Sequence, residues 1–111
     1  MQSMEDMIRA AQQAAETIQK QMDETQGKLD KLEVEGAAGG GLVKIRATAK
    51  GRVIGVTVDE TLLAPGEKGI LEDLIAAAFN DARAKADEVA GAELAKAQQG
   101  MGLPPGFKLP F

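Results

Sequence analysis

The sequence predicts an α+β fold of two layers, an α-β-β-β-α protomer in which a three-stranded antiparallel meander stands between two long, protruding helices. Two observations predict it. Apolar residues recur at alternating spacings of four and three in the first 32 residues, and at helical spacing again after residue 67. From residue 33 to 58, short alternating runs separated by glycine replace that period. Nothing repeats and no composition break is visible, so we expect one domain over residues 1–111.

The first expected helix covers residues 1–32 and carries a weak heptad seam. Its members are Met4, Ile8, Ala11, Ala15, Ile18, Met22, Thr25, Leu29 and Leu32. At about 1.5 Å per residue this helix would run on the order of 45 Å, longer than a compact domain of this size is wide. Much of it must protrude, and its apolar stripe then needs a helix beside it, either the second helix of this chain or one from a twin subunit. We therefore expect a homodimer.

Residues 33–58 are expected to form three strands, and their short connections imply antiparallel pairing. The best alternating run places Val43, Ile45, Ala47 and Ala49 on one face and Lys44, Arg46, Thr48 and Lys50 on the other. The first face should pack on helix, and the second should meet solvent or a partner. The glycines at 39–41 lack the spacing of a phosphate-binding loop and precede a strand, so we interpret them as a turn.

Asp59 is placed to cap a short turn at residues 61–63, and Pro65-Gly66 breaks the chain before a second long helix over residues 67–99. That helix is rich in Ala in its later half, where we expect thinner packing.

Residues 100–111 form a tail with three prolines and two of the three aromatic residues of the chain, Phe107 and Phe111. Termini fray unless something holds them, so these packing groups predict a tail docked on the sheet or on a partner subunit. The alternative is a linear ligand for another protein.

The net charge of −4 argues by itself against a nucleic-acid partner. The charge is unevenly placed, however, because four basic residues and no acidic one lie between Glu35 and Asp59. The four are Lys44, Arg46, Lys50 and Arg52. Three of them share one predicted strand face, where they would offer a positive stripe to phosphates. The alternative is that such residues only keep sheets from pairing edge to edge.

The sequence offers little chemistry for catalysis. It has no His and no Cys, the usual acid-base group and the strongest nucleophile. The carboxylate pairs at 23–24 and 72–73 are neighbours on expected helices, so their side chains diverge. We expect no enzyme, no cofactor, no metal site and no small-molecule substrate. No secretory pattern and no membrane-length apolar run is visible, so we expect a cytoplasmic protein without a membrane partner.

The C-terminal run from Gly100 to Phe111 reads Gly-Met-Gly-Leu-Pro-Pro-Gly-Phe-Lys-Leu-Pro-Phe, an unusual signature of rare residue types at fixed spacing. It resembles the ending of the YbaB/EbfC family of bacterial nucleoid-associated proteins. Segments 32–34, 41–44, 62–63 and 71–82 are similar to family segments in the same order. The resemblance therefore covers nearly the whole chain.

The resemblance implies a small homodimer that binds duplex DNA in the nucleoid, mainly through backbone phosphates and with little sequence preference, with effects on nucleoid organisation and gene expression. Its protruding helices would grip the duplex. Candidate DNA contacts are then Lys44, Arg46, Lys50 and Arg52, followed by Lys20, Lys28, Arg83 and Lys85. Candidates for dimer or tail packing are Ile18, Met22, Leu29, Phe79, Phe107 and Phe111.

A function of a different class stays open at this point. The net acidity and the Ala-rich helices favour a helical protein-interaction module whose association with DNA is weak or indirect. Direct binding of the purified protein to naked duplex would separate the two functions.

Overall fold

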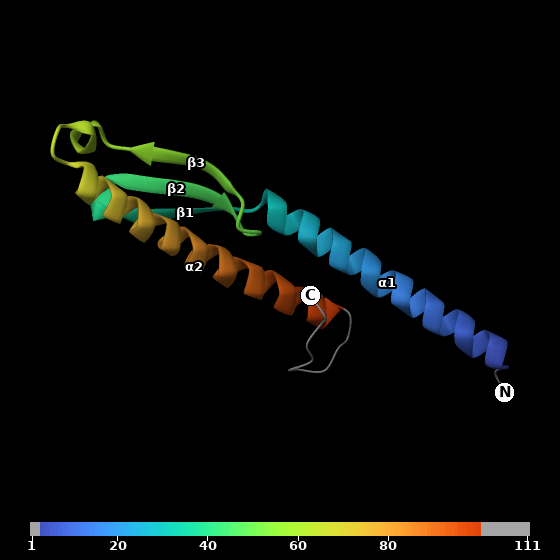
Figure 1. Cartoon of the computed structure of the whole chain (residues 1–111). Helices are drawn as coiled ribbons and strands as arrows, with labels where there is room; N and C mark the ends of the chain where they lie inside the picture. Colours follow the sequence, from blue (N-terminus) through green and yellow to red (C-terminus); the bar gives the residue numbers. More distant parts are fainter. Residues whose placement is uncertain (1–2, 101–111) are drawn as a thin grey trace.

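Two long helices and a three-stranded sheet make up an elongated molecule (Figure 1), seen in a computed structural model that describes residues 3–100. The elements are α1 (Met4–Lys31), β1 (Glu33–Ala38), β2 (Val43–Thr48), β3 (Val53–Val58) and α2 (Lys68–Gly100). The predicted α+β architecture is therefore confirmed. The molecule extends 78 × 22 × 17 Å and its radius of gyration is 20.9 Å, against about 13 Å for a compact chain of this length.

Both ends of α1 follow from its sequence. The Ser3 hydroxyl accepts a hydrogen bond from the Asp6 N–H at 3.2 Å, which caps the first turn. Acidic residues stand in that first turn, and Lys28 and Lys31 stand in the last, as the helix dipole favours. The helix ends at Lys31, because the backbone of the next residue, Leu32, is already extended.

The strands pair antiparallel in the order β1-β2-β3, and α2 lies across β1 and β2 on one face. The core there combines Val43 and Ile45 of β2 with Leu62 and the small side chains Ala78 and Ala82 of α2. Small residues let the helix approach the sheet closely. At Gly36 of β1 the approach is so close that a Cβ would overlap the backbone of α2.

Two details of the connections bear on the sequence predictions. The three glycines after β1 form a turn with positive φ at each residue, between 64° and 97°, and Asp59 caps the short 3-10 turn Glu60–Leu63 by accepting from the Thr61 N–H at 2.9 Å. Both turns agree with the predictions.

The β2–β3 hairpin begins earlier than expected. β2 ends at Thr48, because Gly51 adopts φ 96° and its N–H donates to the Thr48 carbonyl at 2.9 Å. Thr48 is fully buried, with its hydroxyl accepting from the Arg52 N–H at 3.2 Å. The prediction that Lys50 continues the strand face of Lys44 and Arg46 is therefore wrong, since this residue lies at the hairpin tip.

The predicted protrusion of the first helix is confirmed. α2 runs antiparallel beside only the later half of α1, where Lys28 meets Glu93 and Thr25 lies beside Ala97. Leu29 is buried there, whereas the seam residues from Met4 to Ala15 are exposed. Within residues 3–100, neither long helix contains a stretch apolar enough to cross a membrane.

Candidate nucleic-acid interface

The sheet face turned away from α2 carries a ladder of opposite charges. Lys44 and Arg46 of β2 point outward and are about half exposed, as predicted. The register with β1 places acids beside them, so that Lys44 Nζ lies 4.0 Å from Glu35 Oε1 and Arg46 Nη1 lies 3.7 Å from Glu33 Oε1. The positive stripe expected from the sequence of β2 alone is thus partly neutralised by its neighbour strand.

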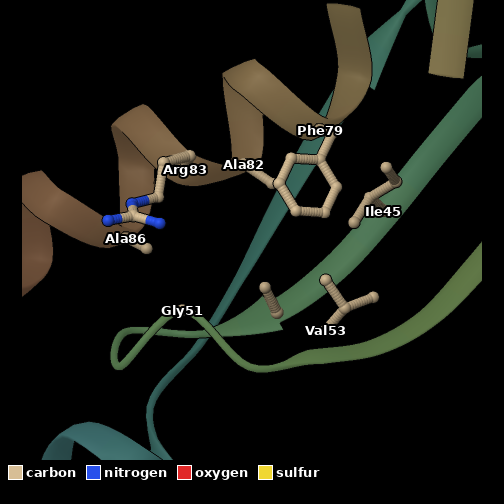
Figure 2. Close-up of a pocket in the computed structure, with 8 residues that line it drawn as sticks. Ile45, Gly51, Val53, Phe79, Ala82, Arg83 and Ala86 are labelled. Carbon is tan, nitrogen blue, oxygen red and sulfur yellow. The ribbon is translucent and has the colours of Figure 1, made fainter. Parts of the chain in front are cut away.

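The hairpin end of the sheet gathers basic residues from two elements. Lys50 and Arg52 flank Gly51, which lines a pocket together with Arg83 of α2 (Figure 2). Arg52 Nε lies 3.3 Å from Asp30 Oδ1, and Arg83 Nε lies 3.3 Å from Asp87 Oδ1. Lys50 is exposed and has no acidic partner within 4.0 Å among the residues that the structure describes. The structure therefore brings Arg83 close to the hairpin that carries Lys50 and Arg52, which sequence spacing could not show.

Lys85 has a different place, at the free edge of β1. Its Nζ donates to the Glu35 carbonyl at 2.9 Å and lies 3.1 Å from Asp81 Oδ2. The same Asp81 oxygen accepts from the Ala37 N–H at 2.9 Å, and this hydrogen bond, followed by that of Lys85, holds the pKa of the Asp81 carboxyl below its usual value. Two side chains of α2 thus satisfy backbone groups of an edge strand, which blocks this edge against further pairing.

The remaining helix candidates lie on α1. Lys28 Nζ is 2.8 Å from Glu93 Oε2, and this contact, ahead of a second one from Lys96, lowers the pKa of the Glu93 carboxyl. Lys28 therefore ties α1 to α2. Lys20 is exposed on the protruding part of α1, with no ion pair to any residue in 3–100.

A second feature is an open apolar groove, here called the β3 groove, between α2 and β3. Val53 and Val56 face the same side as Ile45, but α2 does not cover β3 and leaves both valines about half exposed. Figure 2 shows the Phe79 ring beside Ile45 and across from Val53, at a shallow hollow that Ala82 and Ala86 also line. Phe79 itself is 44% exposed.

Of the residues predicted to pack in a dimer or against the tail, those that the structure describes lie in the groove and on the helices. Among them, Phe79 lines the β3 groove, Ile18 and Met22 are half-buried on α1, and Leu29 is buried inside the single chain. Phe107 and Phe111 lie outside the described residues. Sequence reasoning missed Val53 and Val56 as groove residues. Strict alternation puts residues three apart on opposite faces, and only the irregularity in the β2–β3 pairing brings both valines to one side.

Comparisons with known proteins place this fold and these residues in a family. The sequence matches the YbaB/EbfC DNA-binding family over residues 1–101. A protein of Rickettsia felis called nucleoid-associated protein is 53% identical over 97 residues, which cover 87% of this chain and 91% of that protein. A nucleoid-associated protein of Rickettsia akari is 50% identical with the same coverage.

The fold is also found in a solved structure. The crystal structure of an uncharacterized protein from Helicobacter pylori superposes with a TM-score of 0.69, covering 90% of this chain and all of that one, at 18% sequence identity. At that identity the likeness concerns the fold alone. The family match, in contrast, covers residues 1–101, and the Rickettsia felis relative is 53% identical. This chain therefore belongs to the YbaB/EbfC DNA-binding family.

Proposed function

We propose that this protein is a nucleoid-associated protein that binds duplex DNA as a homodimer, through backbone phosphates and with little sequence preference. The observation that carries the proposal is the group of exposed basic side chains on the outer sheet face and the hairpin. The group, here called the basic cluster, consists of Lys44, Arg46, Lys50 and Arg52. Membership of a DNA-binding family and the names of the Rickettsia relatives support it.

The ion pairs in the cluster are compatible with phosphate binding. Each joins exposed side chains at 3.3 to 4.0 Å, and exposed pairs of this kind contribute about 1 kcal/mol or less to stability. A phosphate oxygen can therefore replace the carboxylate without a large loss. The acids still repel the phosphates, so they should limit the affinity.

Low sequence preference follows from the type of contact. Phosphate contacts set position and affinity but carry no sequence information, whereas base edges in the grooves do. The cluster consists of long, flexible cations on a strand and a turn, which suits it to phosphates. Affinity should therefore depend steeply on salt and weakly on the base sequence.

The homodimer is supported by an asymmetry between the two edges of the sheet. Asp81 and Lys85 occupy the free edge of β1, while β3 has no strand beside its outer edge within residues 3–100 and borders the β3 groove. We place the subunit contact at β3 and the groove, where exposed Val56 and Phe79 would be covered. Two subunits would bring eight cluster side chains to one duplex.

The test replaces all four cluster residues with Ala in the full chain. Binding should weaken for unrelated duplex sequences alike, and the slope of log affinity against log salt should become shallower by about 0.9 per phosphate contact removed. A double replacement of the exposed Lys68 and Lys96 is the control, because it removes positive charge elsewhere. If the cluster variant keeps the slope of the unmodified protein, the basic cluster is not the DNA-binding site.

A protein-interaction module is the second candidate, favoured by the acids that accompany three of the four cluster residues. It predicts no saturable binding of the purified protein to naked duplex.

A further inference from the structure

The protruding half of α1 exposes an apolar stripe that no described residue covers. Met4, Met7 and Ile8 are 77%, 61% and 52% exposed, and the seam continues through Ala11 and Ala15. Large apolar side chains in one continuous row are seldom left bare on a soluble protein, so the stripe needs an occupant. This surface lies at the opposite end of α1 from the sheet, far from the β3 groove (Figure 1).

The end of α2 lies where the bare stripe begins. Ala97 lines the cleft between the helices with Glu24 and Thr25, and α2 ends at Gly100, almost one turn later, at about the level of Gln21. α2 therefore covers the α1 seam from Leu29 to about Gln21 and stops there. Eleven further residues, 101–111, follow from that point.

We propose that residues 101–111 continue along α1 in place of α2 and cover the stripe from Ile18 to Met4 of the same chain. The length fits. From the level of Gln21 to Met4 the axis of α1 measures about 26 Å at 1.5 Å per residue, and eleven residues in an extended, proline-type conformation reach about 34 Å.

In this arrangement the apolar residues of the tail also lie level with apolar residues of the stripe. Phe107 is seven residues past Gly100, so it reaches about 22 Å back along α1, which is about the level of Met7. Leu103 likewise reaches the level of Ala15. The prolines at 104, 105 and 110 favour the extended path and reduce the chain entropy that docking costs.

An unfilled hydrogen-bond acceptor lies where the tail would begin. Gln21 Oε1 is buried and has no hydrogen-bond partner among residues 3–100, and buried acceptors of this kind usually have one. Residues 101–103 are not proline, so each has an N–H to donate. A backbone N–H that follows Gly100 would satisfy this oxygen at the start of the docked segment.

The same chain is a better occupant than α1 of a second molecule. The tail is tethered beside the stripe, which gives it an effective concentration in the millimolar range. A second α1 would have to pair through a seam that has Ala at two of its first four positions, where little apolar area is available to hold two molecules together.

Hydrogen exchange of the full-length protein tests the placement. In the unmodified chain, amides of residues 4–17 should exchange at least tenfold more slowly than in a Phe107→Ala variant. Lys108→Ala, a neighbouring change that removes no apolar contact, should exchange like the unmodified chain. Equal exchange of this segment in all three proteins overturns the proposal. Protection that rises with protein concentration overturns it too, since it points to a second molecule.

A disulfide cross-link identifies which chain supplies the tail. Because the sequence contains no Cys, only the two introduced residues can form the disulfide. The pair Ile8→Cys with Lys108→Cys should oxidise to a species of monomer mass under denaturing conditions. Ala10→Cys with Lys108→Cys is the control, because residue 10 lies about 200° round the helix from residue 8. A disulfide that joins two chains, or equal yields from both pairs, overturns the proposal. DNA binding is measured separately, so its failure and the failure of this proposal are distinguishable.

Discussion

Neutralising the two acids beside the cluster should strengthen DNA binding. The double variant Glu33→Gln with Glu35→Gln removes the carboxylates that lie 3.7 and 4.0 Å from Arg46 and Lys44. A phosphate bound by the same cations would lie about 7 Å from each carboxylate. The repulsion at that distance is about 0.6 kcal/mol in water, and about half of this at 50 mM salt.

Four such carboxylates in a dimer then oppose binding by about 1.2 kcal/mol in total. The double variant should therefore bind a fluorescent duplex about five- to tenfold more tightly in an anisotropy titration. Its melting temperature should change little, because the pairs are exposed.

The control for this prediction is the double variant Glu60→Gln with Glu72→Gln, which changes the net charge equally at exposed positions away from the cluster. It should tighten binding less than twofold. Equal tightening by both double variants would show that net charge alone acts, and weaker binding by the first would refute the placement of phosphates at Lys44 and Arg46.

Three further predictions concern the fold and the subunit contact. Gly36→Ala should lower the free energy of unfolding by about 3 kcal/mol, because its Cβ meets backbone of α2 that cannot move aside. Gly27→Ala, with nothing within 4 Å, should raise it by up to about 1 kcal/mol; thermal melts that rank the two alike would contradict the close packing. The lowered pKa of Asp81 means that its stabilisation is present above about pH 4 and is lost as the pH falls through the folded-state value. The gap in unfolding free energy between the unmodified protein and Asp81→Asn should therefore shrink as the pH is lowered from 7 to 2, and a constant gap in denaturant titrations would contradict this. Phe79→Glu should convert a dimer to a monomer in sedimentation, whereas Leu63→Glu, exposed away from the groove, should not; identical masses for both would move the subunit contact elsewhere.

Much of the fold could be predicted because its signals are local. The heptad seam of α1 and the alternation in β2 each reflect which side chains of one element share a face. The protrusion of α1 followed from its length alone. These predictions needed no knowledge of which element lies beside which.

The candidate site was less predictable because it depends on pairing between elements. The acids of β1 stand beside Lys44 and Arg46 only in the observed register, and Arg83 reaches the hairpin only because α2 crosses β1 and β2. Lys85 looked like a surface cation, yet it closes the edge of β1. Lys50 does not lie on the strand face, because the next residue, Gly51, adopts a positive φ and turns the chain.

The central claim, direct binding to duplex DNA through phosphates, is tested most directly by titrating the purified, nuclease-free protein into two fluorescent duplexes of unrelated sequence at 50 and 200 mM salt. With eight phosphate contacts per dimer, the slope of log affinity against log salt is about −7, so affinity should fall about 10⁴-fold over this range and equally for both duplexes. No saturable binding at 50 mM salt, or binding that salt leaves unchanged, would contradict the account.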